Sequence, residues 1–222
     1  MSLSPVQAVF QAGGAGAPAL MDCVEARMAE VAEGHGLPLS RWAGDTIAAG
    51  GKRVRPLLVG LCAGVPVPHD GGVVAAAVAV ELIHAATLVH DDVLDRSDLR
   101  RGRPTVFAQA GPAAAVATGD LLFSRAFAEL AAAGRVDSVR ALASACADLA
   151  AGELMQRADA YDVGVTVERY LERCRLKTGV LFGAACQLGA LAGGAVSSGL
   201  GAVYGLFVGL GKPSSTTLAR WT

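Results

Sequence analysis

Apolar residues recur at helical spacing along most of this chain, and no stretch shows the sustained alternation of a β-strand. Glycine and proline interrupt the pattern: residues 50–51 are Gly-Gly, and Pro56 falls in the first turn of the helix that follows, where its missing N–H costs nothing. Residues 100–104 predict a basic turn. Besides the helix around Pro56, the pattern predicts helices at about residues 19–34, 39–49, 72–95, 112–133, 136–158, 166–194 and 199–211.

Composition supports an all-α fold of one domain. The chain has 222 residues, of which 53% are hydrophobic and 18% charged, so it is not disordered. With 44 Ala, 28 Gly and two Ile, it favours closely packed Ala-rich helices and disfavours a β-sandwich. A net charge of −1 and 5% aromatic residues give no basic field or stacking platform for nucleic acid.

Domain organisation and location follow from the ends of the pattern and from cysteine use. We expect a flexible arm at residues 1–18, a helical domain at 19–211 and a tail at 212–222 that does not belong to this domain. Five widely separated cysteines without a C-x-x-C pair indicate reduced thiols, and no positively charged start to a signal peptide precedes Asp22. We therefore expect a cytoplasmic protein.

One uncharged stretch, residues 178–211, is long enough to cross a bilayer. Three of its glycines have the small-xxx-small spacing of membrane helices, so a membrane protein is an alternative. However, the stretch contains ten glycines, and arginines lead into it. We favour buried helices of a large bundle and no stable membrane span.

The most informative local signal is the cluster of four aspartates in residues 91–98, directly after a long apolar run. On a helix, Asp91 and Asp95 share one face, and two carboxylates so placed repel each other unless a cation joins them. Hard oxygen ligands in small number suit Mg²⁺, which takes its remaining ligands from water and phosphate. Arginines at 100, 101 and 103 offer forked donors to phosphate oxygens. Together these residues predict a diphosphate substrate, although a solvated helix end with local ion pairs has the same composition.

Several ordered segments resemble the trans-isoprenyl diphosphate synthases, also called polyprenyl synthetases, over about residues 20–211. The specific matches are residues 51–56 (GKRVRP), 81–95 (ELIHAATLVHDDVLD) and 100–105 (RRGRPT). Weaker ones follow in order at residues 119–123 (GDLLF), 152–156 (GELMQ) and 170–178. The resemblance implies an isoprenoid synthase-type helical bundle around a central cavity, usually as a homodimer. It implies head-to-tail prenyl transfer from an allylic diphosphate to isopentenyl diphosphate.

The resemblance also implies roles for particular residues. Asp91 and Asp95 would hold Mg²⁺ on the allylic diphosphate, with Asp92 in support. Arg100 and the pair at 177–178 would contact the same diphosphate. The proposed roles give catalytic residues Asp91, Asp92, Asp95 and Lys177, and substrate-binding residues Lys52, Arg55, His84, Arg100, Arg101, Lys177 and Thr178. Of these, Lys52, Arg55, His84 and Arg101 would bind isopentenyl diphosphate. Lys52 and Lys177 are two of only three lysines in a chain with 16 arginines.

Product length is expected from the positions one turn before the metal ligands. Short-chain members of the family carry a bulky aromatic residue there, which closes the cavity. Here Ala86 and Thr87 are small, so we expect a geranylgeranyl or longer polyprenyl product. The alternative is that both are simple helix-packing residues in an Ala-rich chain.

The C-terminal part departs from the family. Residues 203–211 resemble the helix that precedes a second aspartate-rich motif, but residues 212–222 (KPSSTTLARWT) contain no carboxylate. A frameshift, a premature stop or a foreign tail would each produce this pattern. We therefore expect a bundle that is incomplete at the C-terminus and an impaired enzyme, since a missing electrostatic element costs roughly a hundredfold in rate or more.

Two alternatives to an active synthase remain open from the residues. A class I terpene cyclase shares the paired-aspartate chemistry, but residues 51–56 argue against it because a cyclase has no isopentenyl diphosphate to bind. A non-catalytic or regulatory subunit of a prenyl transferase complex would keep the apolar bundle and pair it with a complete partner.

Overall fold

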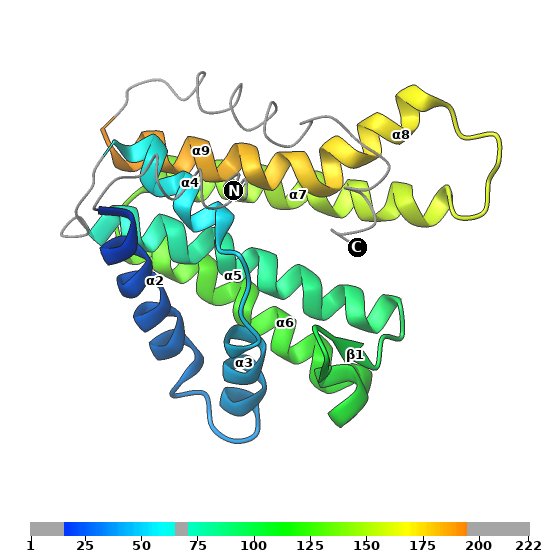
Figure 1. Cartoon of the computed structure of the whole chain (residues 1–222), viewed down its shortest axis with the longest axis horizontal. Coiled ribbons are helices and arrows are strands. Elements are labelled where there is room, and N and C mark those ends of the chain that lie inside the picture. The colour runs from blue at the N-terminus through cyan, green and yellow to red at the C-terminus, as the bar shows by residue number, and fades with distance from the viewer. Residues whose placement is uncertain (1–15, 65–70, 195–222) are drawn as a thin grey trace, which may run out of the picture.

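The computed structural model describes residues 16–64 and 71–194, which form an all-α bundle with one very short hairpin (Figure 1). The elements are α2 (Gly16–Ala32), α3 (Leu39–Ala48), α4 (Val54–Ala63), α5 (Gly71–Leu94), β1 (Leu99–Arg100), β2 (Arg103–Pro104), α6 (Val106–Ala132), α7 (Val136–Ala158), α8 (Val167–Cys174), the π-helical turn η1 (Arg175–Gly179) and α9 (Val180–Ala192). The all-α prediction is confirmed. The predicted helix at 199–211, the tail at 212–222 and residues 1–15 of the predicted arm lie outside the described residues.

Helix α5 is the centre of the fold. Its residues 75–80 and 82–83 are almost fully buried, and it packs against α6 on one side and against α4 and α9 on another. In Figure 1, α7 and α9 run side by side above α5 and α6, while α2 and α3 run across them. This arrangement places the polar end of α5, which carries the aspartates, near η1.

Glycines allow α4 and α9 to approach closely, as the sequence predicted for this Gly-rich stretch. A Cβ at Gly189 would collide with the carbonyl oxygen of Val59, and one at Gly193 with that of Ala63. The two helices therefore pack backbone to backbone, which fixes the second half of α4 against the C-terminal end of α9.

The element boundaries differ from the sequence prediction in three places. Helix α2 begins at Gly16, three residues before the expected boundary. Helix α6 begins at Val106, because Thr105 caps a short first turn before the kink at Gly111 (φ 83°, ψ 177°). The single helix expected at 166–194 is instead α8, η1 and α9, since the i+5 hydrogen bonding of η1 widens the helix at Lys177.

Within the described ranges, two helices are long and apolar enough to span a bilayer, and neither is the stretch at 178–211. They are α5, whose apolar window is 72% buried within the bundle, and α6, whose window is 28% buried. Burial identifies α5 as a core helix, whereas α6 leaves apolar surface uncovered. The described part of the uncharged stretch ends in α9, which has 13 residues.

Candidate active site

A cavity of about 660 Å³ opens where the end of α5, the start of α4, the hairpin and η1 meet. It brings together side chains that lie as far apart in the sequence as Lys52 and Lys177. The predicted site residues that line it are Lys52, Arg55, His84, Thr87, Asp91, Asp95, Arg100, Arg101, Lys177 and Thr178. The described structure therefore places the acidic cluster and the basic segments around one space.

The acidic wall of this cavity consists of Asp91 and Asp95. The backbone N–H of Asp95 donates to the carbonyl of Asp91 at 2.8 Å, which continues the helical spacing past the end of α5 and keeps both carboxylates on one face. Burial raises the pKa of Asp91 above its usual range, and the nearby ammonium of Lys177 opposes that shift. A low-dielectric position of this kind favours an added cation.

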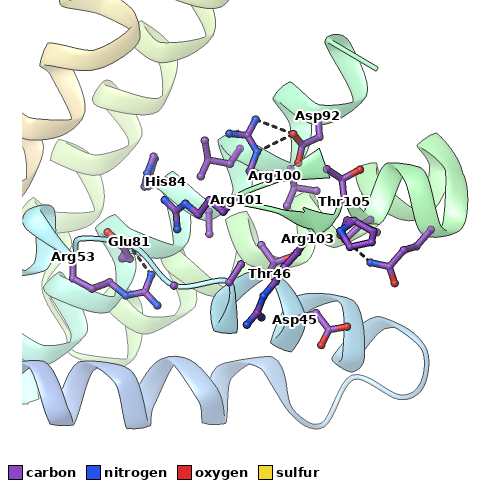
Figure 2. Close-up of a pocket in the computed structure, with 18 residues that line it drawn as sticks. Asp45, Thr46, Arg53, Glu81, His84, Asp92, Arg100, Arg101, Arg103 and Thr105 are labelled. Atoms are coloured by element: carbon purple, nitrogen blue, oxygen red, sulfur yellow. Dashed lines mark hydrogen bonds and ion pairs between the residues drawn. The ribbon is translucent and has the colours of Figure 1, made fainter. Parts of the chain in front are cut away.

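The middle aspartate of the motif, Asp92, faces the hairpin. Asp92 is buried and does not line the larger cavity; its Oδ1 accepts from Nε and from Nη2 of Arg100, each at 2.8 Å (Figure 2). Burial raises the pKa of Asp92, and the hydrogen bond from Arg100 opposes this. Asp92 thus holds β1 of the hairpin against α5.

The hairpin presents Arg101 to the cavity. Arg101 and Gly102 have φ values of 52° and 75°, so they form a two-residue turn of the left-handed kind that connects short antiparallel strands. The guanidinium of Arg101 lies over Gly51, where a Cβ would be only 3.1 Å from Nη1. Gly51 therefore lets the hairpin approach the loop that carries Lys52.

Arg55 and His84, together with Lys52 and Arg101, form the basic wall of the cavity. The surroundings of Arg55 and His84 disfavour the charged form of each. The Arg55 guanidinium stacks on the ring of Phe182 at 4.4 Å, and its Nε has no hydrogen-bond partner in the described structure. Burial lowers the pKa of Arg55, although the charge of Glu81 opposes this. Burial, followed by the neighbouring arginines 55 and 101, lowers the pKa of His84 well below 6.5. An anion bound here would relieve both penalties.

Arg53 and Glu81, which lie in the motif segments but had no predicted role, form an ion pair that supports the basic wall. Arg53 has a left-handed backbone (φ 47°) just before α4. Its Nη1 donates to the buried Glu81 at 3.0 Å and its Nε to Glu25 at 2.6 Å (Figure 2 shows the Glu81 pair). These ion pairs tie the loop before α4 to α5 and α2.

A smaller cavity of about 260 Å³ lies next to Arg101 and is lined by Arg103, which does not reach the larger cavity.

The π-helical turn brings Lys177 to the acidic wall. Nζ of Lys177 lies 2.6 Å from Oε2 of Glu153 and 3.8 Å from Oδ2 of Asp91. The approach depends on Gly152, since a Cβ there would be 2.7 Å from the backbone nitrogen of Lys177. Glu153 belongs to the GELMQ segment noted in the sequence, but no pattern assigned it a partner 24 residues away.

The two positions expected to control product length differ. Thr87 lines the cavity, and its hydroxyl donates to the carbonyl of His84 at 2.8 Å. Ala86, one residue before Thr87 on α5, is fully buried in the core on another face of the helix and does not line this cavity. Its expected role in product length stays a prediction. The apolar wall comes mainly from other helices, at Leu149, Leu181 and Phe182.

The donor set of the acidic wall fits Mg²⁺ that is shared with a phosphate ligand. The described residues contain no group of three or more His, Cys, Asp or Glu side chains that could hold a metal alone. Asp91 and Asp95 offer hard oxygens from one side, and the basic wall faces them across the cavity. Mg²⁺ commonly takes one or two carboxylates and completes its shell with phosphate oxygens and water.

A paired-aspartate helix that faces a basic hairpin inside an all-α bundle defines an isoprenoid synthase-type fold. The polyprenyl synthetase family model matches residues 38–212, and the chain belongs to this family. Heptaprenyl diphosphate synthase component 2 of Geobacillus stearothermophilus is 44% identical over 158 residues, which are 71% of this chain and 49% of that protein. Octaprenyl diphosphate synthase of Escherichia coli is 40% identical over 149 residues, 66% of this chain and 46% of that protein.

Solved structures agree with the fold. A decaprenyl diphosphate synthase from Rhodobacter capsulatus has a TM-score of 0.82 at 36% identity and covers 92% of this chain and 63% of its own. A polyprenyl synthase from Caulobacter crescentus, complexed with calcium and isoprenyl diphosphate, has a TM-score of 0.82 at 34% identity, over 95% of this chain and 63% of its own. The chain spans about half the length of the curated relatives it matches.

Proposed function

We propose that this chain acts in Mg²⁺-dependent prenyl transfer, in which an allylic diphosphate condenses with isopentenyl diphosphate. The observation that carries the proposal is the pair of opposed walls, with Asp91 and Asp95 on one side of a single cavity and Lys52, Arg55 and Arg101 on the other. Carboxylates for a metal and guanidiniums for phosphate match the charges of a metal diphosphate. The family's named synthases make this the natural substrate class.

At the acidic wall, the chain would hold the allylic substrate. Asp91 and Asp95 would carry Mg²⁺, which neutralises charge on the diphosphate as it leaves. Lys177 and Thr178 would bind the same diphosphate from η1, and Arg100 would approach it from the hairpin. The C–O bond of the allylic substrate breaks, and the electron pair leaves with the diphosphate. Fixed positive charge on the cavity wall would stabilise that departure.

At the basic wall, Lys52, Arg55, His84 and Arg101 would bind isopentenyl diphosphate. Its double bond attacks the allylic cation, a carbon–carbon bond forms, and a proton passes from the neighbouring carbon to the released diphosphate. The chain's part in this step is to hold the two substrates in line, which removes much of the entropic cost of the encounter. The low pKa of His84 keeps its ring neutral near pH 7, so it would act as a hydrogen-bond partner.

For the product, we keep geranylgeranyl or a longer polyprenyl chain. Thr87 is a small side chain on the cavity wall one turn before Asp91, and the relatives include geranylgeranyl, heptaprenyl and octaprenyl diphosphate synthases. Small residues at this position leave room for a growing chain.

For the assembly, we infer a cytoplasmic homodimer. The support is α6, whose apolar face is only partly covered within the bundle, as expected for a surface that packs against a second chain. A second candidate is a subunit of a two-component synthase, which is favoured by the printed name of the Geobacillus relative, component 2.

The test is isothermal titration of isopentenyl diphosphate, and of inorganic diphosphate with and without Mg²⁺, followed by a radiolabelled prenyl-transfer assay. We expect inorganic diphosphate to bind at least tenfold more tightly with Mg²⁺ in the wild-type chain, and this gain to be lost in Asp91→Asn. Asp137→Asn is the matched control, since Asp137 is exposed on α7 and pairs with Arg140. An affinity for inorganic diphosphate that is the same with and without Mg²⁺, or an equal effect of both variants, would contradict the proposal.

A further inference from the structure

Each carboxylate of the acidic wall already faces a basic side chain of its own chain. Nζ of Lys177 is 3.8 Å from Oδ2 of Asp91, and Nη2 of Arg157 is 3.0 Å from Oδ1 of Asp95. Both cations also share one acceptor. Glu153 accepts from Lys177 through Oε2 at 2.6 Å and from Arg157 through Oε1 at 3.1 Å. The two cations that face the proposed metal ligands Asp91 and Asp95 are thus both paired with one further carboxylate, Glu153 on α7.

Arg157 has three acceptors spread over two helices. Its Nε donates to Glu153, its Nη1 to the carbonyl of Leu94 at 3.3 Å, and its Nη2 to Asp95. Leu94 is the last residue of α5, where a cation interacts favourably with the helix dipole. If Asp95 turned toward a metal ion, Arg157 would still keep two of its three partners. Its present position therefore does not depend on Asp95.

Arg157 differs from the other basic residues of the site in its relation to the cavity. It does not line the cavity, whereas Lys177, Arg100 and Arg101 do. Its removal would take away no direct contact with a ligand in that space. A guanidinium that holds a carboxylate oxygen competes with a divalent cation for the same lone pairs, and the two positive charges also repel each other.

We propose that Arg157 is a positioning residue that holds Asp95 before the metal arrives and competes with Mg²⁺ for it. Glu153 is the second acceptor that keeps Arg157 within reach when Asp95 binds the metal. This inference rests on the proposed Mg²⁺ function of Asp91 and Asp95. It adds a charge exchange, in which the guanidinium of Arg157 releases the carboxylate of Asp95 and the metal ion binds that carboxylate instead.

The experiment measures binding of Mn²⁺, an EPR-visible substitute for Mg²⁺, to the full chain at saturating inorganic diphosphate. Arg157→Gln is expected to bind Mn²⁺ roughly two- to fivefold more tightly, the range that one partly exposed ion pair accounts for. Arg157→Lys, which keeps the charge, should stay near wild type. Arg140→Gln is the matched control, because Arg140 is exposed on the same helix and pairs with Asp137.

A double-variant cycle tests the part assigned to Glu153. Glu153→Gln should weaken Mn²⁺ binding, since Arg157 then retains Asp95 as its remaining carboxylate partner among those described here. The loss should be smaller when Arg157 is already Gln. Equal losses in both backgrounds would show that Glu153 acts without Arg157, which would overturn this part of the proposal.

The outcomes separate the two proposals. A wild-type chain that binds no Mn²⁺ with diphosphate overturns the metal site itself. A wild-type chain that binds Mn²⁺, together with Arg157→Gln that binds it equally or more weakly, overturns the competition alone. Arg157→Met, which keeps the apolar stem without the charge, replaces Gln if thermal melting shows that the Gln variant is unfolded.

Discussion

The two walls of the cavity differ in how their charges are balanced. On the acidic wall, Asp91 and Asp95 already face Lys177 and Arg157 of the same chain, and both cations also pair with Glu153. On the basic wall, Arg55 has an unpaired Nε in the described structure, and His84 lies among arginines that lower its pKa. One wall is neutralised internally, and the other carries excess positive charge.

This difference indicates how each wall binds. A ligand anion at the basic wall gains from the positive charge of the buried Arg55, which Glu81 offsets only in part. A metal ion at the acidic wall must replace an existing ion pair, so its net gain is smaller than the bare charges suggest. We therefore expect diphosphate to bind first at the basic wall and the metal to depend more strongly on a bound phosphate.

The largest effect is expected from the acidic wall. Asp91→Asn combined with Asp95→Asn should lower prenyl transfer by on the order of 100-fold or more, because a preorganised electrostatic element would be lost. Steady-state rates with Mg²⁺ and both substrates measure this. Asp137→Asn on the exposed face of α7 should leave the rate unchanged. A near wild-type rate in the double variant would show that Asp91 and Asp95 do not take part in prenyl transfer.

On the basic wall, Arg101→Ala should weaken isopentenyl diphosphate binding about tenfold, the loss of a charge-assisted hydrogen bond. The matched control is Arg103→Ala, because Arg103 lies on the same hairpin but lines the smaller cavity. Isothermal titration in the absence of metal distinguishes them. If the Arg103 variant lost as much affinity as the Arg101 variant, the ligand would lie in the smaller cavity.

The position of the basic wall depends on the contact between α4 and α9. Gly189→Ala should lower the free energy of unfolding by about 1–3 kcal/mol, because its Cβ would overlap the Val59 carbonyl oxygen. Gly183→Ala on the same helix has open space and should be neutral or stabilising by about 0.5–1 kcal/mol. Urea unfolding of both variants gives the comparison, and equal stabilities would contradict the close packing.

The apolar space between the walls is tested at Thr87. Thr87→Phe should shorten the main product by one or more prenyl units, because an aromatic ring would fill the wall one turn before Asp91. Ala86→Ser, in the core next to it, changes no cavity residue and should leave product length unaltered. Chromatography of the products measures both, and an unchanged distribution in Thr87→Phe would refute a role in length control.

The smallest effect is a pH dependence from His84. Its pKa in the folded chain is well below the ordinary 6.5, so the unfolded chain takes up a proton first as the pH falls below 6.5. This group's stabilising contribution is therefore complete above pH 6.5 and declines toward its folded pKa, by at most about 1.4 kcal/mol per unit of pH. Urea unfolding at pH 5.5 and 7.5 should show a smaller difference in His84→Gln than in wild type. An equal difference in both would show that His84 is not the group.

Helical periodicity predicted most of the fold, and the resemblance to the polyprenyl synthetases implied most of the site residues that line the cavity. Helix spacing places Asp91 and Asp95 on one face, and a Gly-Gly-Lys segment before Pro56 predicts a loop that precedes a helix. Both signals are local to one element, and the structure confirms the elements. The role expected of each residue comes from the resemblance, whereas its place on a helix or in a loop comes from the sequence pattern.

The features that sequence reasoning missed all depend on contacts between elements. Arg157 and Glu153 have helical i,i+4 spacing, but nothing in the sequence shows that Arg157 also reaches the end of α5. Ala86 was expected to bear on product length through the resemblance, and the sequence alone did not show that it is buried in the core beside Thr87. The widened turn at Lys177 depends on Gly152 in another helix. Such contacts are set by packing and have no signature within one segment.

The central claim is that the cavity binds a magnesium diphosphate between its two walls. The most direct test is the anomalous scattering of Mn²⁺ in crystals of the full chain grown with a non-reactive allylic diphosphate analogue. We predict a metal peak bonded to Asp91 and Asp95 and to diphosphate oxygens, with Lys177 on the same diphosphate. A peak away from both aspartates, or a diphosphate bound outside the cavity, would contradict the account.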